Sequence, residues 1–237
     1  MHKIVVISDY VCPYCYVAEE ALKQAAEGRE DMVTEFHPYE LTRKPAPQVD
    51  TYHDNVRREK WAGGLVPDAE SLGMDVHFPP CVVPRPYTHL AAEGFLYARE
   101  RGKGDAYNEA VFAAYFTEEQ DIGKIEVLKK AAGKAGLDGE EFAAALGSGI
   151  YAKAVEQERH ETEGITKISG LPTILIDGRK AEIERYTLDA FKALLEEADR
   201  RQTEGVADDV CCESSEPVQE EEEEMHEGGC GDGGCFF

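Results

Sequence analysis

The chain has 237 residues, of which 42% are apolar and 9% aromatic, and a formal net charge of −23 at pH 7. This composition predicts one large or two small globular domains with a proper core. The excess of acid excludes nucleic acid and anionic membranes as partners, because both need clustered Lys and Arg. No apolar stretch is long enough to span a bilayer. The first residues lack a signal-peptide pattern, so we expect a cytoplasmic protein.

A C-x-x-C motif lies between a predicted strand and a predicted helix. The β-branched run 4–7 is typical of a buried strand, and residues 16–26 favour a helix. Pro13 suits the first helical position, which puts Cys12 at the N-cap. There the unpaired N–H groups and the helix dipole stabilise a thiolate. Cys15 lies one turn further on, close enough to attack a mixed disulfide formed at Cys12.

The same motif also opens zinc sites, but these need a second pair of ligands at a suitable spacing. The next cysteine, Cys81, stands alone, so redox chemistry is favoured over metal binding for Cys12 and Cys15. In a reducing compartment, seven cysteines indicate catalysis, sensing or metal binding rather than structural disulfides. Cys81 has apolar neighbours, which predicts a buried, inert thiol in preference to a regulatory one.

The remaining elements complete a single sheet. Strand 32–37 is predicted to pair in parallel with the first strand through a right-handed crossover. From about residue 41 the chain is almost entirely helical in pattern until strand character returns after Gly170. A strand then follows Pro172, a hairpin turn falls at 177–178, and residues 188–201 form a final helix. The order β-α-β, helices, β-β-α predicts an α/β fold with a four-stranded sheet and an inserted all-helical domain.

This order resembles the thioredoxin-like fold, and the large helical insertion resembles the DsbA-like branch of that superfamily, in particular its FrnE-type cytosolic dithiol–disulfide oxidoreductases. The matching segments are 9–16, 36–41, 113–116 with 121–122, and 164–165 leading to 170–173. The order of elements predicts a discontinuous thioredoxin-like domain and an inserted helical domain, and the composition predicts an acidic C-terminal tail that the resemblance does not cover. Their predicted bounds are 1–40 with 166–202, 41–165, and 203–237.

The resemblance implies exchange of a Cys12–Cys15 dithiol or disulfide with protein or small-molecule thiols, with no cofactor required and with a redox partner that it does not identify. It also implies that Pro172 is cis and faces the two cysteines. The predicted catalytic residues are therefore Cys12, Cys15 and Pro172. Supporting roles are predicted for a further set: Asp9, Pro13, Tyr14, Leu171 and Thr173.

Two of these predictions have alternatives. Asp9 either tunes the Cys12 thiol or relays a proton, or it is a solvated turn residue. Family members that act as glutathione-dependent isomerases or transferases carry serine in place of the first cysteine, so Cys12 argues against that activity. One segment departs from the family, since residues 180–186 stand where a Gly-rich turn is expected before the last helix.

The C-terminal segment 203–237 carries a charge of −12 with no Lys or Arg, which predicts disorder. It also holds four of the seven cysteines. Cys230 and Cys235 could form a second dithiol that passes electrons to the first. Alternatively, the tail binds Zn or Cu(I), which thiolates favour, and the protein is then a thiol-rich metal-handling protein. That metal site would use Cys211, Cys212, His226, Cys230 and Cys235. The third interpretation is an acidic solubilising tail.

Overall fold

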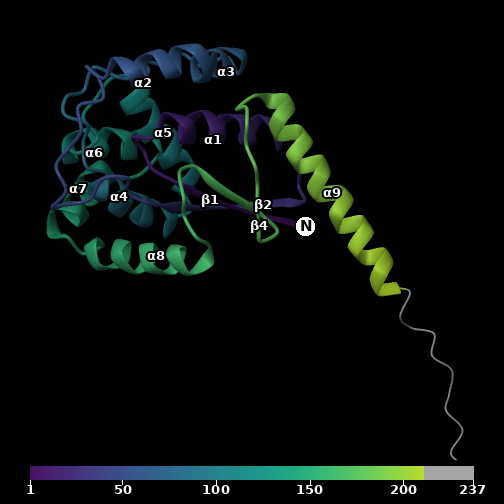
Figure 1. Ribbon diagram of the computed structural model, residues 1–237. Coiled ribbons are helices and arrows are strands. Elements are labelled where there is room, and N and C mark those ends of the chain that lie inside the picture. Colours follow the sequence, from purple (N-terminus) through teal and green to yellow (C-terminus); the bar gives the residue numbers. More distant parts are fainter. Residues whose placement is uncertain (211–237) are drawn as a thin grey trace, which may run out of the picture. The chain divides into compact units, whose positions relative to one another are not determined.

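The computed structural model describes residues 1–210, with side chains up to residue 204 (Figure 1). Residues 1–200 form one compact unit. The elements in chain order are β1 (His2–Ser8), α1 (Pro13–Ala25), β2 (Met32–Pro38), α2 (Asn55–Lys60), a π-helical turn η1 (Trp61–Leu65), α3 (Val66–Ser71), α4 (His89–Arg99), α5 (Gly104–Phe116), α6 (Ile125–Lys134), α7 (Gly139–Ser148), α8 (Ala152–Ile165), β3 (Thr173–Ile176), β4 (Arg179–Lys180) and α9 (Leu188–Val210).

The four strands form one sheet in the order β2-β1-β3-β4. β1 pairs in parallel with β2 and antiparallel with β3, and β4 is the antiparallel edge. In this register Val6 lies between Phe36 on β2 and Ile174 on β3. The predicted α/β fold is confirmed, including the parallel β-α-β start, the closing hairpin and a stretch between β2 and β3 whose regular elements are all helical.

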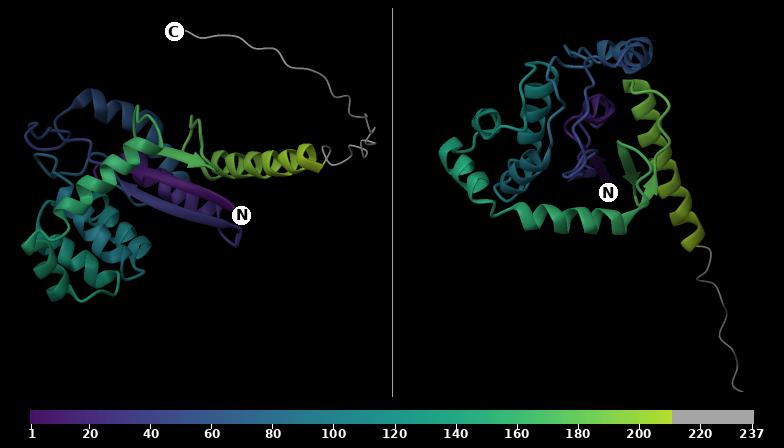
Figure 2. Two further views of the ribbon diagram at one scale, coloured as in Figure 1. Left: turned by 90° about the horizontal axis from the view of Figure 1, so that it is seen from below. Right: turned by 60° about the vertical axis from the view of Figure 1, so that its left-hand side comes forward.

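Alternation along β1 supplies both faces of the sheet with apolar side chains. Ile4 and Val6 join the main core, to which α1 contributes its buried face. Val5 and Ile7 point to the other face and form a smaller cluster with Leu175 of β3. Figures 1 and 2 show α1 on one side of the sheet and α8 running along the opposite side. β1 is therefore buried on both faces, which explains its β-branched composition.

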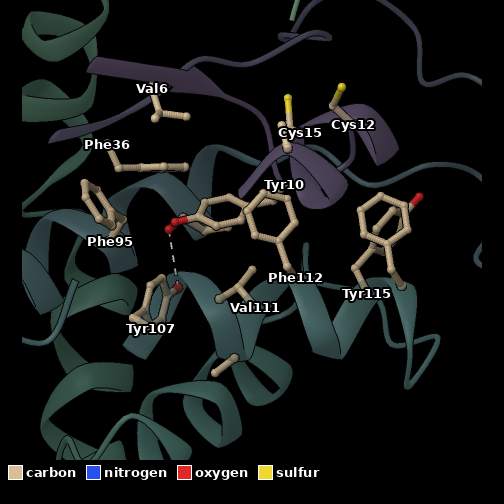
Figure 3. Packing of buried hydrophobic residues seen from close by; sticks show 14 of the residues in the cluster. Val6, Tyr10, Cys12, Cys15, Phe36, Phe95, Tyr107, Val111, Phe112 and Tyr115 are labelled. Atoms are coloured by element: carbon tan, nitrogen blue, oxygen red, sulfur yellow. Dashed lines mark hydrogen bonds between the residues drawn. The ribbon is translucent and has the colours of Figure 1, made fainter. Parts of the chain in front are cut away.

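Tyr10 connects the C-x-x-C turn to the helices of the insertion. Its ring lies 5.6 Å from that of Phe36 and 5.1 Å from that of Phe112, and it meets Tyr107 edge-on at 6.5 Å (Figure 3). Its hydroxyl donates a buried hydrogen bond to the Asn108 side-chain carbonyl. The sheet and the adjoining helices thus share one aromatic core, while the predicted bounds of the insertion, 41–165, stay a prediction.

The final helix is longer than predicted. α9 continues to Val210, so the predicted disorder is corrected for residues 203–210. Extending a helix that is already nucleated gains one backbone hydrogen bond per residue, and the sequence has no proline between the start of α9 at Leu188 and Pro217. Among the described residues, no helix is both long and apolar enough to cross a membrane.

Gly94 allows α4 to approach its neighbours closely. A Cβ there would overlap the Tyr107 hydroxyl and lie 2.7 Å from Cζ of Phe142. Gly94→Ala is therefore expected to destabilise the fold by about 1–3 kcal/mol in urea unfolding, the usual range for overpacking. The matched control is Gly133→Ala on α6, where an added Cβ meets nothing within 4 Å and should stabilise by about 0.5–1 kcal/mol. Equal effects of the two changes would contradict this packing.

Candidate active site

The structure places Cys12 at the N-cap of α1, with Pro13 as the first helical residue. The Cys12 carbonyl accepts from the amides of Cys15 at 3.1 Å and Tyr16 at 3.3 Å, which begins the helix. Cys12 is 4% exposed and Cys15 is fully buried. Both sulfurs point to the same side, away from the aromatic layer beneath them (Figure 3).

The loop before β3 lies next to the cysteine pair in space, although the two are about 160 residues apart in the sequence. The peptide bond between Leu171 and Pro172 is cis, and the Sγ of Cys12 lies 3.7 Å from the Leu171 carbonyl oxygen. Thr173 is buried opposite Ile7 of β1, and its hydroxyl donates to the Gly170 carbonyl at 2.8 Å. This bond closes the turn behind the proline.

The two thiols have different surroundings. Burial raises the pKa of Cys15 well above its ordinary value, and its hydrogen bond with Cys12 and the charge of Cys12 raise it further. A hydrogen bond from the Ser8 side chain and one from the Asp9 backbone act in the opposite direction. Cys15 therefore keeps its proton at neutral pH, and a thiolate at Cys12 would have that thiol as a donor.

Asp9 is buried, which corrects the interpretation of a solvated turn residue. Its carboxylate accepts from the Leu41 backbone amide at 2.6 Å. Burial raises the pKa of Asp9 to about 6, while hydrogen bonds from Leu41 and Thr88 and the charge of Arg85 hold it lower than burial alone would. The turn before Cys12 is thus tied to the segment that follows β2.

A second carboxyl, on the half-buried Glu19, was missed in the sequence. Its carboxylate accepts from the Ser8 hydroxyl at 3.1 Å, and burial raises its pKa to about 8. Ser8 is fully buried and contacts both Glu19 and Cys15. The available signal was the spacing, because Glu19 lies four residues after Cys15 and hence on the same face of α1.

The outer side of the site carries two tyrosines. Tyr14 is half-buried, and its ring lies 5.4 Å from that of Tyr186, in the segment that precedes α9. Burial raises the pKa of Tyr14, and the charge of Cys12 raises it further. The Lys60 Nζ lies 5.9 Å from the centre of the Tyr14 ring. Tyr186 was also missed, although its segment was recognised as a departure from the family.

The predicted burial of Cys81 is wrong, since this cysteine is exposed. Prolines on both sides of it prevent regular structure, and its backbone amide donates instead to the Glu119 carboxylate at 2.7 Å. The remaining predictions on cysteines concern residues outside those described: the second dithiol and the metal ligands of the tail. The residues in question are Cys211, Cys212, His226, Cys230 and Cys235.

Within the described side chains, one group has the geometry to hold a metal ion, namely His2, Asp31 and Asp199. It contains neither active-site cysteine. Its members already interact with one another and with charged neighbours. The Nε2 of His2 lies 2.9 Å from Asp199, and Arg29 binds both carboxylates. These contacts describe an ion-pair cluster that ties α9 to the start of β1.

Comparison with known proteins agrees with this fold. A family model, the DSBA-like thioredoxin domain, matches residues 3–204. The uncharacterized protein YwbO of Bacillus subtilis is 42% identical over 173 residues, which cover 73% of this chain and 86% of that protein.

Solved structures with the same fold are more distant in sequence. A probable DsbA oxidoreductase from Streptomyces coelicolor has a TM-score of 0.67 at 22% identity, over 84% of this chain and 90% of that one. The cytosolic disulfide reductase DsbM from Pseudomonas aeruginosa, solved with GSH, has a TM-score of 0.65 at 17% identity, over 84% and 99%. A 2-hydroxychromene-2-carboxylate isomerase has a TM-score of 0.67 at 20% identity, over 87% and 98%. With the family model matched over residues 3–204, this chain belongs to the DSBA-like thioredoxin domain family.

Proposed function

We propose that this protein is a thiol–disulfide oxidoreductase in which Cys12 is the attacking sulfur and Cys15 the resolving one. The observation that carries the proposal is the position of Cys12, at the N-terminus of α1 and 3.7 Å from the Leu171 carbonyl, with the buried Cys15 thiol behind it. Membership of the DsbA-like family supports the same activity. The FrnE-type branch stays a prediction.

The exchange proceeds in two steps. In the reduced protein the Cys12 thiolate attacks one sulfur of a substrate disulfide, which forms a Cys12–substrate disulfide and releases the other substrate sulfur as a thiolate. Cys15 then loses its proton and attacks Cys12, which forms the Cys12–Cys15 disulfide and releases the second substrate thiolate. Two electrons pass from the dithiol to the substrate. The reverse sequence oxidises a substrate dithiol.

Cys15 needs a proton acceptor because its burial favours the thiol. Ser8 is suited to connect it to Glu19, since the Ser8 hydroxyl contacts both groups. A carboxyl whose pKa lies about 8 can exchange a proton near neutral pH. In this mechanism the ionised fraction of Glu19 receives the Cys15 proton when the mixed disulfide is resolved, and the protonated carboxyl returns it in the reverse direction.

The substrates are protein or small-molecule thiols and disulfides. The structure of the P. aeruginosa disulfide reductase with GSH makes glutathione disulfide the first small substrate to test. The intact Cys12 favours exchange over the isomerase activity of another structural relative. We assign no cofactor to the reaction, because both electrons reside in the two sulfurs. The redox partner is not assigned, and the cytoplasmic location stays a prediction.

Cys12→Ser is expected to lower turnover of glutathione disulfide to the uncatalysed rate, because serine cannot form the mixed disulfide. Cys15→Ser should instead accumulate protein with one glutathione attached at Cys12, located by peptide mass mapping. Cys81→Ser, which removes an exposed thiol outside the site, is the control and should keep full turnover. Full turnover by Cys12→Ser would disprove the proposed function.

Glu19 should make stability depend on pH. Its pKa is raised from the ordinary 4.5 to about 8 in the folded protein, so the folded state holds this proton more tightly than the unfolded state. The resulting stabilisation is fully present below pH 4.5 and is lost as pH rises through about 8. Glu19→Gln lacks this titration.

Urea unfolding at pH 5 and pH 9 measures the effect. Relative to Glu19→Gln, the wild type should lose free energy of unfolding between the two values. At pH 5 both side chains are uncharged in the folded state, so that comparison reports any packing cost of the amide. Parallel pH profiles for the two proteins would contradict the burial of a proton at Glu19.

A further inference from the structure

The segment that departs from the family, residues 180–186, is anchored to the helical insertion. Asp68 on α3 is 3% exposed, and its carboxylate receives the Arg185 guanidinium in a bidentate contact whose Nε lies 3.0 Å from Oδ1 and 3.2 Å from Oδ2. The backbone amide of Tyr186 donates to Oδ2 of the same carboxylate at 2.9 Å. One buried acid therefore fixes two consecutive residues that follow it by more than a hundred positions.

This anchor determines where the Tyr186 ring lies. The ring packs 5.4 Å from that of Tyr14 and 6.5 Å from that of Phe191, at the start of α9. Burial raises the pKa of Tyr186, and the charges of Cys12 and Cys15 raise it further, which is the effect of two nearby sulfurs. The ring contact with Tyr14, two residues after Cys12, places Tyr186 near the reacting pair, although no hydrogen bond joins them in the described contacts.

Tyr14 is held from the same part of the chain. Its hydroxyl oxygen accepts from the Trp61 indole N–H in η1, and η1 leads directly into α3, which carries Asp68. Residues 61–68 therefore support both tyrosines that flank the cysteines. The 4% exposure of Cys12 shows that its surroundings restrict the approach of a second sulfur.

We propose that Tyr186 is a substrate-selecting residue of this active site and that Asp68 is the positioning residue that holds it, through Arg185 and through the Tyr186 backbone amide. With Tyr14 the Tyr186 ring forms an aromatic wall beside Cys12. This wall admits small disulfides, of the size of glutathione disulfide, more readily than disulfides within folded proteins. The inference rests on the proposed function, since the selected step is the attack of Cys12 on a substrate disulfide.

The first measurement uses chemical access and needs no turnover. Reduced protein is alkylated with iodoacetamide and, separately, with a bulky maleimide, and the rate at Cys12 is followed by peptide mass mapping. In Tyr186→Ala the maleimide rate should rise about tenfold relative to the iodoacetamide rate. Tyr186→Phe keeps the ring and should retain the wild-type ratio. An unchanged ratio in Tyr186→Ala would overturn the inference.

The second measurement separates positioning from a general structural role. Arg185 is 63% exposed, so Arg185→Ala should fold. It removes the guanidinium contact to Asp68 and leaves only the Tyr186 amide bond, which loosens the ring without removing it. We expect a shift of the alkylation ratio in the same direction as Tyr186→Ala, by several-fold, and a rise of kcat/KM for insulin disulfides relative to glutathione disulfide. Arg179→Ala, at another exposed arginine on β4, should leave both ratios unchanged.

The outcomes distinguish the two proposals. If Cys12→Ser abolishes turnover but neither ratio responds to the changes at Tyr186 and Arg185, the selecting role is wrong and the exchange function stands. If Cys12→Ser retains turnover, the exchange function is wrong whatever the alkylation ratios show. If the ratio shifts in Tyr186→Ala and in Arg179→Ala alike, the effect is a general loosening and the assignment to the Asp68 anchor is wrong.

Discussion

The geometry of the candidate site depends on the burial of β1 on both of its faces. A strand in that position cannot slide or tilt without opening two apolar interfaces. The three residues at and after the end of β1, Ser8 to Tyr10, are then fixed in position, each by a different contact. Ser8 binds a carboxyl on α1, Asp9 binds the backbone after β2, and Tyr10 enters the aromatic core of the helices. Cys12 follows two residues later, so these contacts also determine its position.

Charge is distributed unevenly around the sulfurs. Glu19, the carboxyl connected to Cys15, is neutral near pH 7, whereas Asp9 is largely ionised because its pKa is about 6. The buried Cys15 is also neutral. A negative charge at Cys12 would be stabilised by the positive end of α1 and by the Cys15 thiol as a hydrogen-bond donor. The contacts that connect Cys15 to Glu19 run through Ser8 and do not involve Cys12. The arrangement places the neutral Cys15 thiol behind Cys12.

The local part of the site could be predicted from the sequence. A β-branched run, a short turn, C-P-x-C and a helix follow one another in the sequence, so the N-cap position of Cys12 depends on its sequence neighbours. The residues that were missed depend on distant contacts. From the sequence alone Glu19 has the pattern of a solvated helix residue, and only the structure reveals its hydrogen bond with Ser8. Tyr186 gains its position from Asp68, which no local pattern connects to it. The prediction for Cys81 relied on local pattern alone and was wrong. Its sequence neighbours are apolar, but the prolines around it keep this loop out of the core, so Cys81 is exposed.

The hairpin that completes the sheet also affects how the molecule meets other chains. β4 has only two residues, Arg179 and Lys180, and both are exposed and basic. An edge strand this short offers few free backbone groups to an incoming strand, and its like charges oppose stacking against a second copy of the same edge. The β4 edge of the sheet therefore disfavours the addition of a strand from an unfolded polypeptide. This protection applies to the β4 edge alone, because the opposite edge of the sheet is β2, which has seven residues.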